Sequence, residues 1–204
     1  MITIVNYGSG NIKAIGNIYE RFKIPFKIAN CPDEIMGAEK IILPGVGAFD
    51  ETIYMLDKLD FRRVLDHEVL RNGVPVLGIC VGMQILAENS EEGNLPGLGW
   101  IPGHVKKFDK SFLKFKPKLP HLGWNSIKLA KPNGLFDEVD EEQGFYFLHS
   151  YYFECADSEN VLSTTIYGKT FPSSVNHGNI YGVQFHPEKS HHNGISILKN
   201  FARL

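Results

Sequence analysis

Short apolar runs alternate with amphipathic stretches through the first half of the chain. The runs, which are typical of buried strands, lie at residues 2–6, 26–29, 40–45 and 75–80. Between them, apolar residues recur at helical spacing and predict helices over 11–22 and 49–72. Repeated alternation of strand and helix predicts a parallel sheet that is covered by helices on both faces.

The second half of the chain has a different pattern. From about residue 101 the apolar segments are shorter, more aromatic and separated by turn residues. We expect them to form antiparallel strands added to the same sheet, with a hairpin turn at 176–179 and a closing helix over 194–204. The predicted fold class is therefore α/β, a mostly parallel central sheet flanked by helices with antiparallel strands added in the C-terminal half. No linker or repeat interrupts the pattern, so residues 1–204 are expected to form one domain.

Composition narrows the possible classes of protein. Hydrophobic residues make up 43% of the 204 residues and charged residues 22%, as in globular proteins. A net charge of −2 provides no general attraction to nucleic acid or membranes, and the apolar runs are too short to cross a bilayer. The N-terminus lacks the features of a signal peptide. Three cysteines without metal or disulfide spacing favour a reducing cytoplasm.

One cysteine stands at a position suited to catalysis. Cys80 ends the apolar run at 75–80, has Gly78 and Gly82 two positions away on each side, and precedes a predicted helix over 83–87. Glycines allow a sharp strand-to-helix turn that exposes the sulfur, and a helix N-terminus favours the thiolate and offers N–H groups to an oxyanion. The alternative is a small buried hydrophobic residue.

A thiolate nucleophile needs a histidine, and His186 is the best candidate among eight. On an extended segment His186 and Glu188 would face the same way, so that the carboxylate could orient the ring. The alternative is a solvated surface turn. A zinc site including His191 and His192 is disfavoured because the spacing matches no standard pattern. The glycines of "LPGVGAFD" (43–50) could supply a second oxyanion donor or simply form a βα loop.

The order of the motifs is more specific than any one of them. "PGVG" (44–47), "GICVGMQ" (78–84), "SEEG" (90–93) and "GVQFHPEKS" (182–190) together resemble the class I, triad-type glutamine amidotransferases. Within that family, "NYGSGN" (6–11), "PHLGWN" (120–125) and "FYFLHSYY" (145–152) resemble the glutaminase subunits of imidazole glycerol phosphate synthases. The resemblance spans nearly the whole chain and implies a flavodoxin-like α/β fold.

The resemblance also implies roles for individual residues. Cys80 would attack the side-chain amide of L-glutamine, His186 would carry the proton to the departing ammonia, and Glu188 would orient His186. The implied oxyanion hole consists of Gly45, Val46, Gly47 and Val81. The implied glutamine-binding residues are Gln84, Glu92, His149, Ser150 and Tyr151, and those at the partner interface are Asn11, Trp124 and Lys189. No cofactor and no metal are implied.

The implied partner is a (β/α)8 cyclase subunit, HisF, in a heterodimer that makes imidazole glycerol phosphate and aminoimidazole carboxamide ribonucleotide. Other interpretations remain open. A paralogous glutaminase could supply ammonia to a sugar-modifying amidotransferase in surface-polysaccharide synthesis, and a free-standing cysteine hydrolase or an inactive scaffold would keep the same fold. The stretch 106–118 holds six lysines and one aspartate. We interpret it as a solvated edge, the alternative being a docking surface for an acidic partner.

Overall fold

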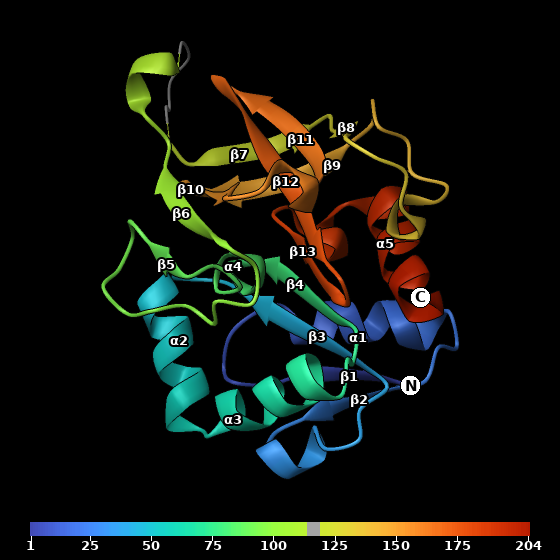
Figure 1. Ribbon diagram of the computed structural model, residues 1–204. Coiled ribbons are helices and arrows are strands. Elements are labelled where there is room, and N and C mark those ends of the chain that lie inside the picture. The colour runs from blue at the N-terminus through green and yellow to red at the C-terminus, as the bar shows by residue number, and fades with distance from the viewer. Residues whose placement is uncertain (114–118) are drawn as a thin grey trace.

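The computed structural model describes residues 1–113 and 119–204. Its centre is an eight-stranded sheet in the order β2-β1-β3-β4-β13-β12-β11-β8 (Figure 1). The strands of this sheet are β1 (Ile2–Val5), β2 (Phe26–Ala29), β3 (Lys40–Gly45), β4 (Val76–Cys80), β8 (Lys128–Leu129), β11 (Val161–Tyr167), β12 (Lys169–His177) and β13 (Ile180–Val183).

The first five strands of this order form the parallel part of the sheet. β1 pairs with β2 and β3, β3 pairs with β4, and β4 pairs with β13, all in parallel. Their order is the 2-1-3-4-5 order of flavodoxin-like folds, in which ligands bind beyond the carboxyl ends of the strands. β1 and β4 are buried along their whole length, as their continuous apolar sequences predict. The predicted parallel sheet is confirmed.

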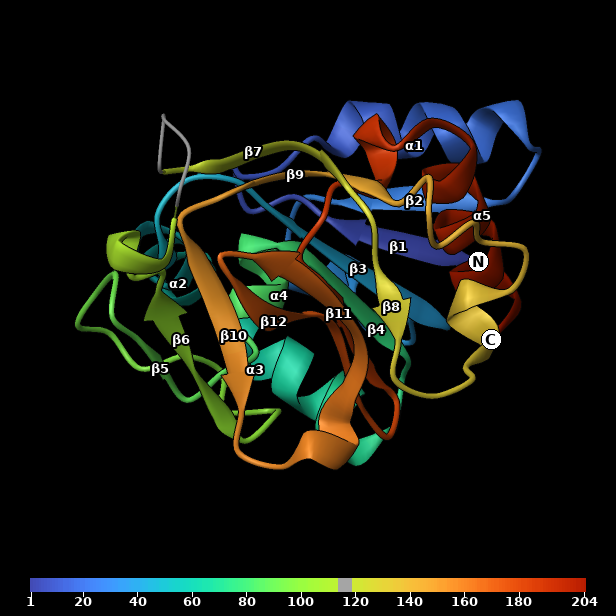
Figure 2. The same ribbon diagram turned by 90° about the horizontal axis from the view of Figure 1, so that it is seen from above.

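Helices cover both faces of the sheet. Figures 1 and 2 show α1 (Ile12–Arg21) and α5 (His191–Arg203) on one face and α2 (Phe49–Lys58) and α3 (Phe61–Asp66) on the other. The segment over 49–72 is helical over most of its length, as predicted, but it does not form one helix. The helix breaks at Asp60, whose φ of 56° is left-handed, a conformation that aspartate adopts more readily than most residues. A short π-helical turn, η2 (His67–Arg71), completes the segment.

Antiparallel strands extend the sheet on one side only. β12 pairs with β13 across the predicted hairpin turn, and β11 and β8 follow in antiparallel pairs. Five other strands do not join this sheet, and for the four of them that lie after residue 101 this differs from our expectation. β5 (Asn89–Ser90), β6 (Gly103–Lys107) and β10 (Tyr151–Cys155) form a second sheet, and β7 (His121–Asn125) and β9 (Phe145–His149) form a third.

Aromatic side chains explain why these strands pack onto the main sheet instead of pairing at its edge. The ring of Phe108 lies 5.1 Å from that of Phe171 on β12 and 4.7 Å from that of Tyr152 on β10. Burial of such large apolar rings between two layers stabilises face-to-face packing.

The helix that follows Cys80 begins and ends earlier than predicted. α4 covers only Val81–Gln84, and the segment over 83–87 is not a helix beyond its first turn. The carbonyl of Leu86 accepts a hydrogen bond from the amide of Ile101, and that of Ala87 from Gly99. The amides of Gly99 and Ile101 thus take the place of the donors that a further helical turn would supply.

The lysine-rich stretch is only partly described, because residues 114–118 lie outside the described ranges. In its described part, Lys106 forms an ion pair with Glu154 at 2.6 Å and Lys107 lies over the ring of Tyr151. Within the described ranges, no helix is both long and apolar enough to cross a bilayer.

Candidate active site

Cys80 lies at a strained turn at the carboxyl end of β4. Its φ of 56° and ψ of −112° place it outside the regions that ordinary residues prefer, as at the nucleophile elbow of α/β-hydrolases. A Cβ at Gly82 would collide with the carbonyl of Leu43, and one at Gly78 with the carbonyl of Gly82. The glycines are therefore needed for close approach, as predicted, whereas the left-handed turn itself is made by the cysteine.

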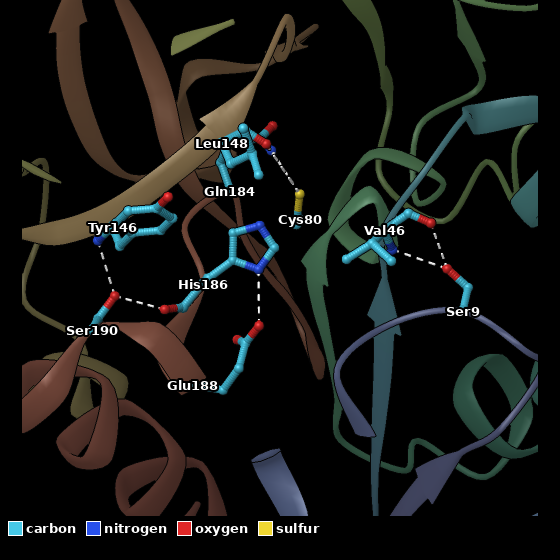
Figure 3. Close-up of polar contacts among 9 residues, drawn as sticks. All are labelled: Ser9, Val46, Cys80, Tyr146, Leu148, Gln184, His186, Glu188 and Ser190. Atoms are coloured by element: carbon cyan, nitrogen blue, oxygen red, sulfur yellow. Dashed lines mark hydrogen bonds and ion pairs between the residues drawn. The ribbon is translucent and has the colours of Figure 1, made fainter. Parts of the chain in front are cut away.

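The sulfur of Cys80 is more enclosed than the sequence suggested. The residue is only 4% exposed, because β9 covers it. Its Sγ lies 3.9 Å from the carbonyl oxygen of Leu148 and 3.8 Å from Nε2 of Gln184 (Figure 3). The expectation of an exposed sulfur is wrong for this conformation, because the Leu148 carbonyl of β9 lies against it.

His186 and Glu188 form a buried pair. Nδ1 of His186 lies 3.0 Å from Oε1 of Glu188, and both side chains are 2% exposed. The amide of His186 donates to the carbonyl of Tyr146, and its own carbonyl accepts from the hydroxyl of Ser190 (Figure 3). The predicted partnership is confirmed, but the local geometry is not extended. A 3-10 turn, η6 (Pro187–Lys189), brings the carboxylate back to the ring.

The charges around His186 favour the imidazolium. Burial alone lowers the pKa of His186, but its hydrogen bonds and charge interactions with Cys80 and Glu188 outweigh burial and raise the pKa to about 10. The second carboxylate oxygen of Glu188, Oε2, is buried without a hydrogen-bond partner among the described residues. The carboxylate therefore acts mainly on His186, and the site is suited to a thiolate–imidazolium pair.

The predicted oxyanion loop lies next to Cys80. Gly45 is the register partner of Cys80 across β3 and β4, and Val81 follows Cys80 directly. The amide of Val46, however, already donates to Oγ of Ser9 at 2.9 Å, and the same hydroxyl donates to the Val46 carbonyl at 2.7 Å (Figure 3). Gly47 has a φ of 104°, which a non-glycine residue would rarely adopt. In this conformation the Val46 amide is not available to an oxyanion.

The predicted glutamine-binding residues divide into two groups. Gln84 is buried, and its Nε2 donates to the carbonyl of Tyr151 at 3.1 Å and to Oε1 of Gln184 at 3.0 Å. His149 and Ser150 directly precede Tyr151, so this group lies at the Cys80 side of β9. The carboxylate of Glu92 instead accepts from the amide of Phe49 at 3.0 Å, at the start of α2. No glutamine contact tests these roles, which stay predictions.

The predicted interface residues lie at the surface. Trp124 is 44% exposed, and its ring stacks on that of His191 with centroids 5.4 Å apart. Nζ of Lys189 lies 5.7 Å from the ring of Tyr146, the cross-strand partner of Trp124. Trp124 and Lys189 therefore share one patch. Asn11 is exposed immediately before α1.

The structure brings together residues that the sequence did not single out. Ser9 contacts the oxyanion loop, and Gln184 lies between Gln84 and the sulfur. Gln184 is two positions before His186, a spacing that could have indicated a shared face. No group of three or more histidine, cysteine, aspartate or glutamate residues in the described ranges could hold a metal ion.

The family model "Glutamine amidotransferase class-I" matches residues 3–204. The chain belongs to this family. The resemblance inferred from its motifs is confirmed, and so is the expectation that this glutamine amidotransferase is an enzyme. The nucleophile, histidine and glutamate expected in the family from its motifs are all present and adjacent.

Two relatives that match the chain over its full length carry the same name. The amidotransferase is 50% identical over 204 residues to "Imidazole glycerol phosphate synthase subunit HisH" of Bdellovibrio bacteriovorus, covering all of both chains. It is 47% identical to the protein of the same name from Leptospira borgpetersenii, again over all of both chains.

Solved structures confirm the fold. The chain resembles a structure described as a glutamine amidotransferase with a TM-score of 0.72 and 16% identity, covering 100% of this chain and 99% of the other. It also resembles the structure of PurLQS from Thermotoga maritima, with a TM-score of 0.69, 18% identity and coverage of 99% of this chain and 97% of the other.

Proposed function

We propose that this chain is the glutamine-hydrolysing subunit of an imidazole glycerol phosphate synthase, acting in the cytoplasm in histidine biosynthesis. The observation that carries the hydrolytic part is the buried His186–Glu188 pair next to Cys80. The assignment to this synthase is supported by the relatives named HisH, which match the chain from end to end.

The geometry supports a thioester mechanism. The thiolate of Cys80 adds to the side-chain amide carbon of glutamine, and the imidazolium of His186 gives its proton to the departing nitrogen, so that ammonia leaves and a glutamyl thioester forms. Water then attacks the thioester with His186 as general base, which releases glutamate and restores the thiolate. Glu188 holds the Nδ1–H tautomer and stabilises the imidazolium throughout.

The oxyanion hole requires a change in the loop over 45–47. The amide of Val81 is fixed by the turn after Cys80, but the amide of Val46 is engaged by Ser9. Release of Val46 would supply a second donor to the tetrahedral intermediate, and one such donor is worth about 10²–10³ in turnover. We therefore expect low turnover until the loop is rearranged.

The surface supports a partner protein. Ammonia is mostly protonated at neutral pH, so a synthase needs its acceptor site docked to the glutaminase. The side chains of Leu122, Trp124 and Leu148 are 57%, 44% and 37% exposed on the outward face of the β7–β9 sheet. Exposed apolar side chains grouped in this way are typical of interaction sites. We propose the (β/α)8 cyclase subunit, HisF, as the partner.

Glutamate release tests this proposal. The chain should release little glutamate from L-glutamine by itself, and much more with the cyclase subunit of the same genome and its nucleotide ligand. An unstimulated chain would contradict the synthase assignment. Stimulation by a sugar-modifying amidotransferase instead would establish the alternative acceptor.

A further inference from the structure

The two-stranded β7–β9 sheet has an outward face and an inward face. Its outward face carries the exposed side chains described above. Its inward face carries two histidines, His121 and His149, which are register partners and are only 3% and 6% exposed. The hydrolytic mechanism uses neither imidazole, so this buried pair requires its own explanation.

Backbone carbonyls fix the tautomers of both rings. Nδ1 of His149 lies 2.7 Å from the carbonyl oxygen of Tyr151, which can only accept, so Nδ1 carries the proton. Nε2 of His149 must then accept from Nδ1–H of His121, 3.0 Å away. That leaves Nε2 of His121 as an acceptor for Nδ2 of Asn125 at 3.2 Å. The Asn125 amide is itself oriented, because Nδ2 also donates to the carbonyl of Ile166 at 3.0 Å.

The chain of hydrogen bonds continues to the nucleophile. The carbonyl of Tyr151 accepts a second hydrogen bond from Nε2 of Gln84, whose other hydrogen goes to Oε1 of Gln184. With Oε1 accepting, Nε2 of Gln184 is the group directed at Sγ of Cys80. Every amide and ring orientation along this route follows from the two carbonyls of Tyr151 and Ile166.

The surroundings keep both histidines neutral. The ring of His121 stacks between those of Phe147 and Tyr167, with centroids 4.7 and 4.1 Å away. Burial lowers the pKa of His121 to about 4. Burial, together with repulsion from His121, lowers the pKa of His149 to about 3. A proton on Nε2 of either ring would place two donors against each other, so the chain of hydrogen bonds exists only with two neutral rings.

We propose that His121 and His149 are positioning residues for glutamine hydrolysis. As a neutral pair, they hold the Tyr151 carbonyl in the position that orients Gln84 and Gln184 beside Cys80. They also join the inward face of the partner-facing sheet to the wall of the glutamine pocket. This inference rests on the proposed function, since it assigns the pair to that same reaction.

The tautomers provide the first test, on the wild-type chain. Long-range ¹H–¹⁵N correlation spectra of the ¹⁵N-histidine-labelled protein should show two neutral Nδ1–H rings at pH 7, assigned by their loss in His121→Phe and His149→Phe. An Nε2–H tautomer or a charged ring at either position would overturn the proposal. The wild-type spectrum itself requires neither enzymatic activity nor a variant. Only the assignment requires folded variants, and His121→Asn can replace His121→Phe for that purpose.

Kinetics with the partner present provide the second test. His121→Phe keeps the stacking but removes the donor to His149, and we expect about a tenfold rise in KM for glutamine with a smaller change in kcat. His121→Asn places an amide donor near the position of Nδ1 and should return KM to within about threefold of the wild type. A folded His121→Phe variant with wild-type KM and kcat would contradict the proposal. Failure of the wild-type chain to hydrolyse glutamine would instead overturn the proposed function, leaving the tautomer test intact.

Discussion

Nδ1 of His186 and Oε1 of Glu188 lie 3.0 Å apart in a site where both side chains are 2% exposed. At this burial the carboxylate interacts with the ring in a low-dielectric surrounding, where a charge interaction is much stronger than in water. The pair therefore controls both the orientation of the imidazole and its proton affinity. Cys80 is the third member of the triad, and its interactions with His186 also raise the pKa of that histidine.

Replacing Glu188 by glutamine separates charge from shape. In Glu188→Gln the amide oxygen can still accept from Nδ1–H, while the buried negative charge is removed. We expect kcat/KM to fall roughly 10²-fold and the pKa of His186 to drop below its wild-type value of about 10, so that the imidazolium is lost at lower pH. The alkaline limb of the pH–rate profile should move to lower pH, and an unchanged limb would refute the role of Glu188.

Removing the nucleophile should abolish hydrolysis without unfolding the chain. Cys80→Ser is expected to lower glutamate release by about 10⁴-fold or more, since members of such a triad act as a unit. Cys155→Ser is the matched control. Burial, with a contribution from Asp157, raises the pKa of the Cys155 thiol to about 12, so this cysteine stays protonated and its loss should leave turnover near the wild-type value. Retained hydrolysis in Cys80→Ser would refute the nucleophile assignment.

The hydroxyl of Ser9 should restrain the free enzyme. Ser9→Ala removes both hydrogen bonds that hold the Val46 peptide, so the loop over 45–47 can offer its amide to an oxyanion more often. We expect glutamate release by the isolated chain to rise by about three- to tenfold, the order of one net hydrogen bond. Ser9→Thr keeps the hydroxyl and should resemble the wild type. Equal basal rates in all three proteins would show that Ser9 does not limit the loop.

The neutral histidine pair should make the fold sensitive to mild acid. The pKa of His121 is lowered from about 6.5 to about 4 in the folded chain, so the unfolded chain binds more protons between these values. The stability that this contributes is present above pH 6.5 and is lost as the pH falls toward 4. In His121→Phe the free energy of unfolding should depend less on pH in this window, by up to about 1.4 kcal/mol per pH unit for one proton. Denaturant titrations at pH 7, 6 and 5 measure the free energy of unfolding of both proteins. The same dependence on pH in the wild type and in His121→Phe would contradict the assignment of a neutral buried ring.

The parallel half of the fold could be predicted because its signals are local. Continuous apolar runs marked β2 and β3 at their observed bounds, and helical spacing marked α1 to within one residue at each end. The break in the helix at Asp60 could not be predicted in this way, because apolar spacing continues on both sides and no glycine or proline marks the turn. The early end of α4 at Gln84 could not be predicted, because amides from residues 99 and 101, distant along the sequence, bind the carbonyls of Ala87 and Leu86 just beyond it.

The site was predictable where chemistry depends on neighbours in sequence. Glycines around Cys80, and a carboxylate two positions after His186, are visible in the sequence itself. Ser9 and Val46, which are in contact, are 37 positions apart in the sequence, and His121 and His149 are 28 positions apart. Such contacts depend on which strands the fold places side by side. The sequence could therefore name Cys80, His186 and Glu188, but not side chains such as Ser9 and His121 that lie far from them along the chain.

The central claim is that Cys80 is the glutamine-attacking nucleophile. The most direct test is mass spectrometry of the chain after treatment with a glutamine-like electrophile, in the presence and absence of excess L-glutamine. We predict one adduct, on the peptide that contains Cys80, and its suppression by L-glutamine. An adduct on Cys31 or Cys155 with Cys80 unmodified, or labelling of Cys80 that L-glutamine does not suppress, would contradict the account.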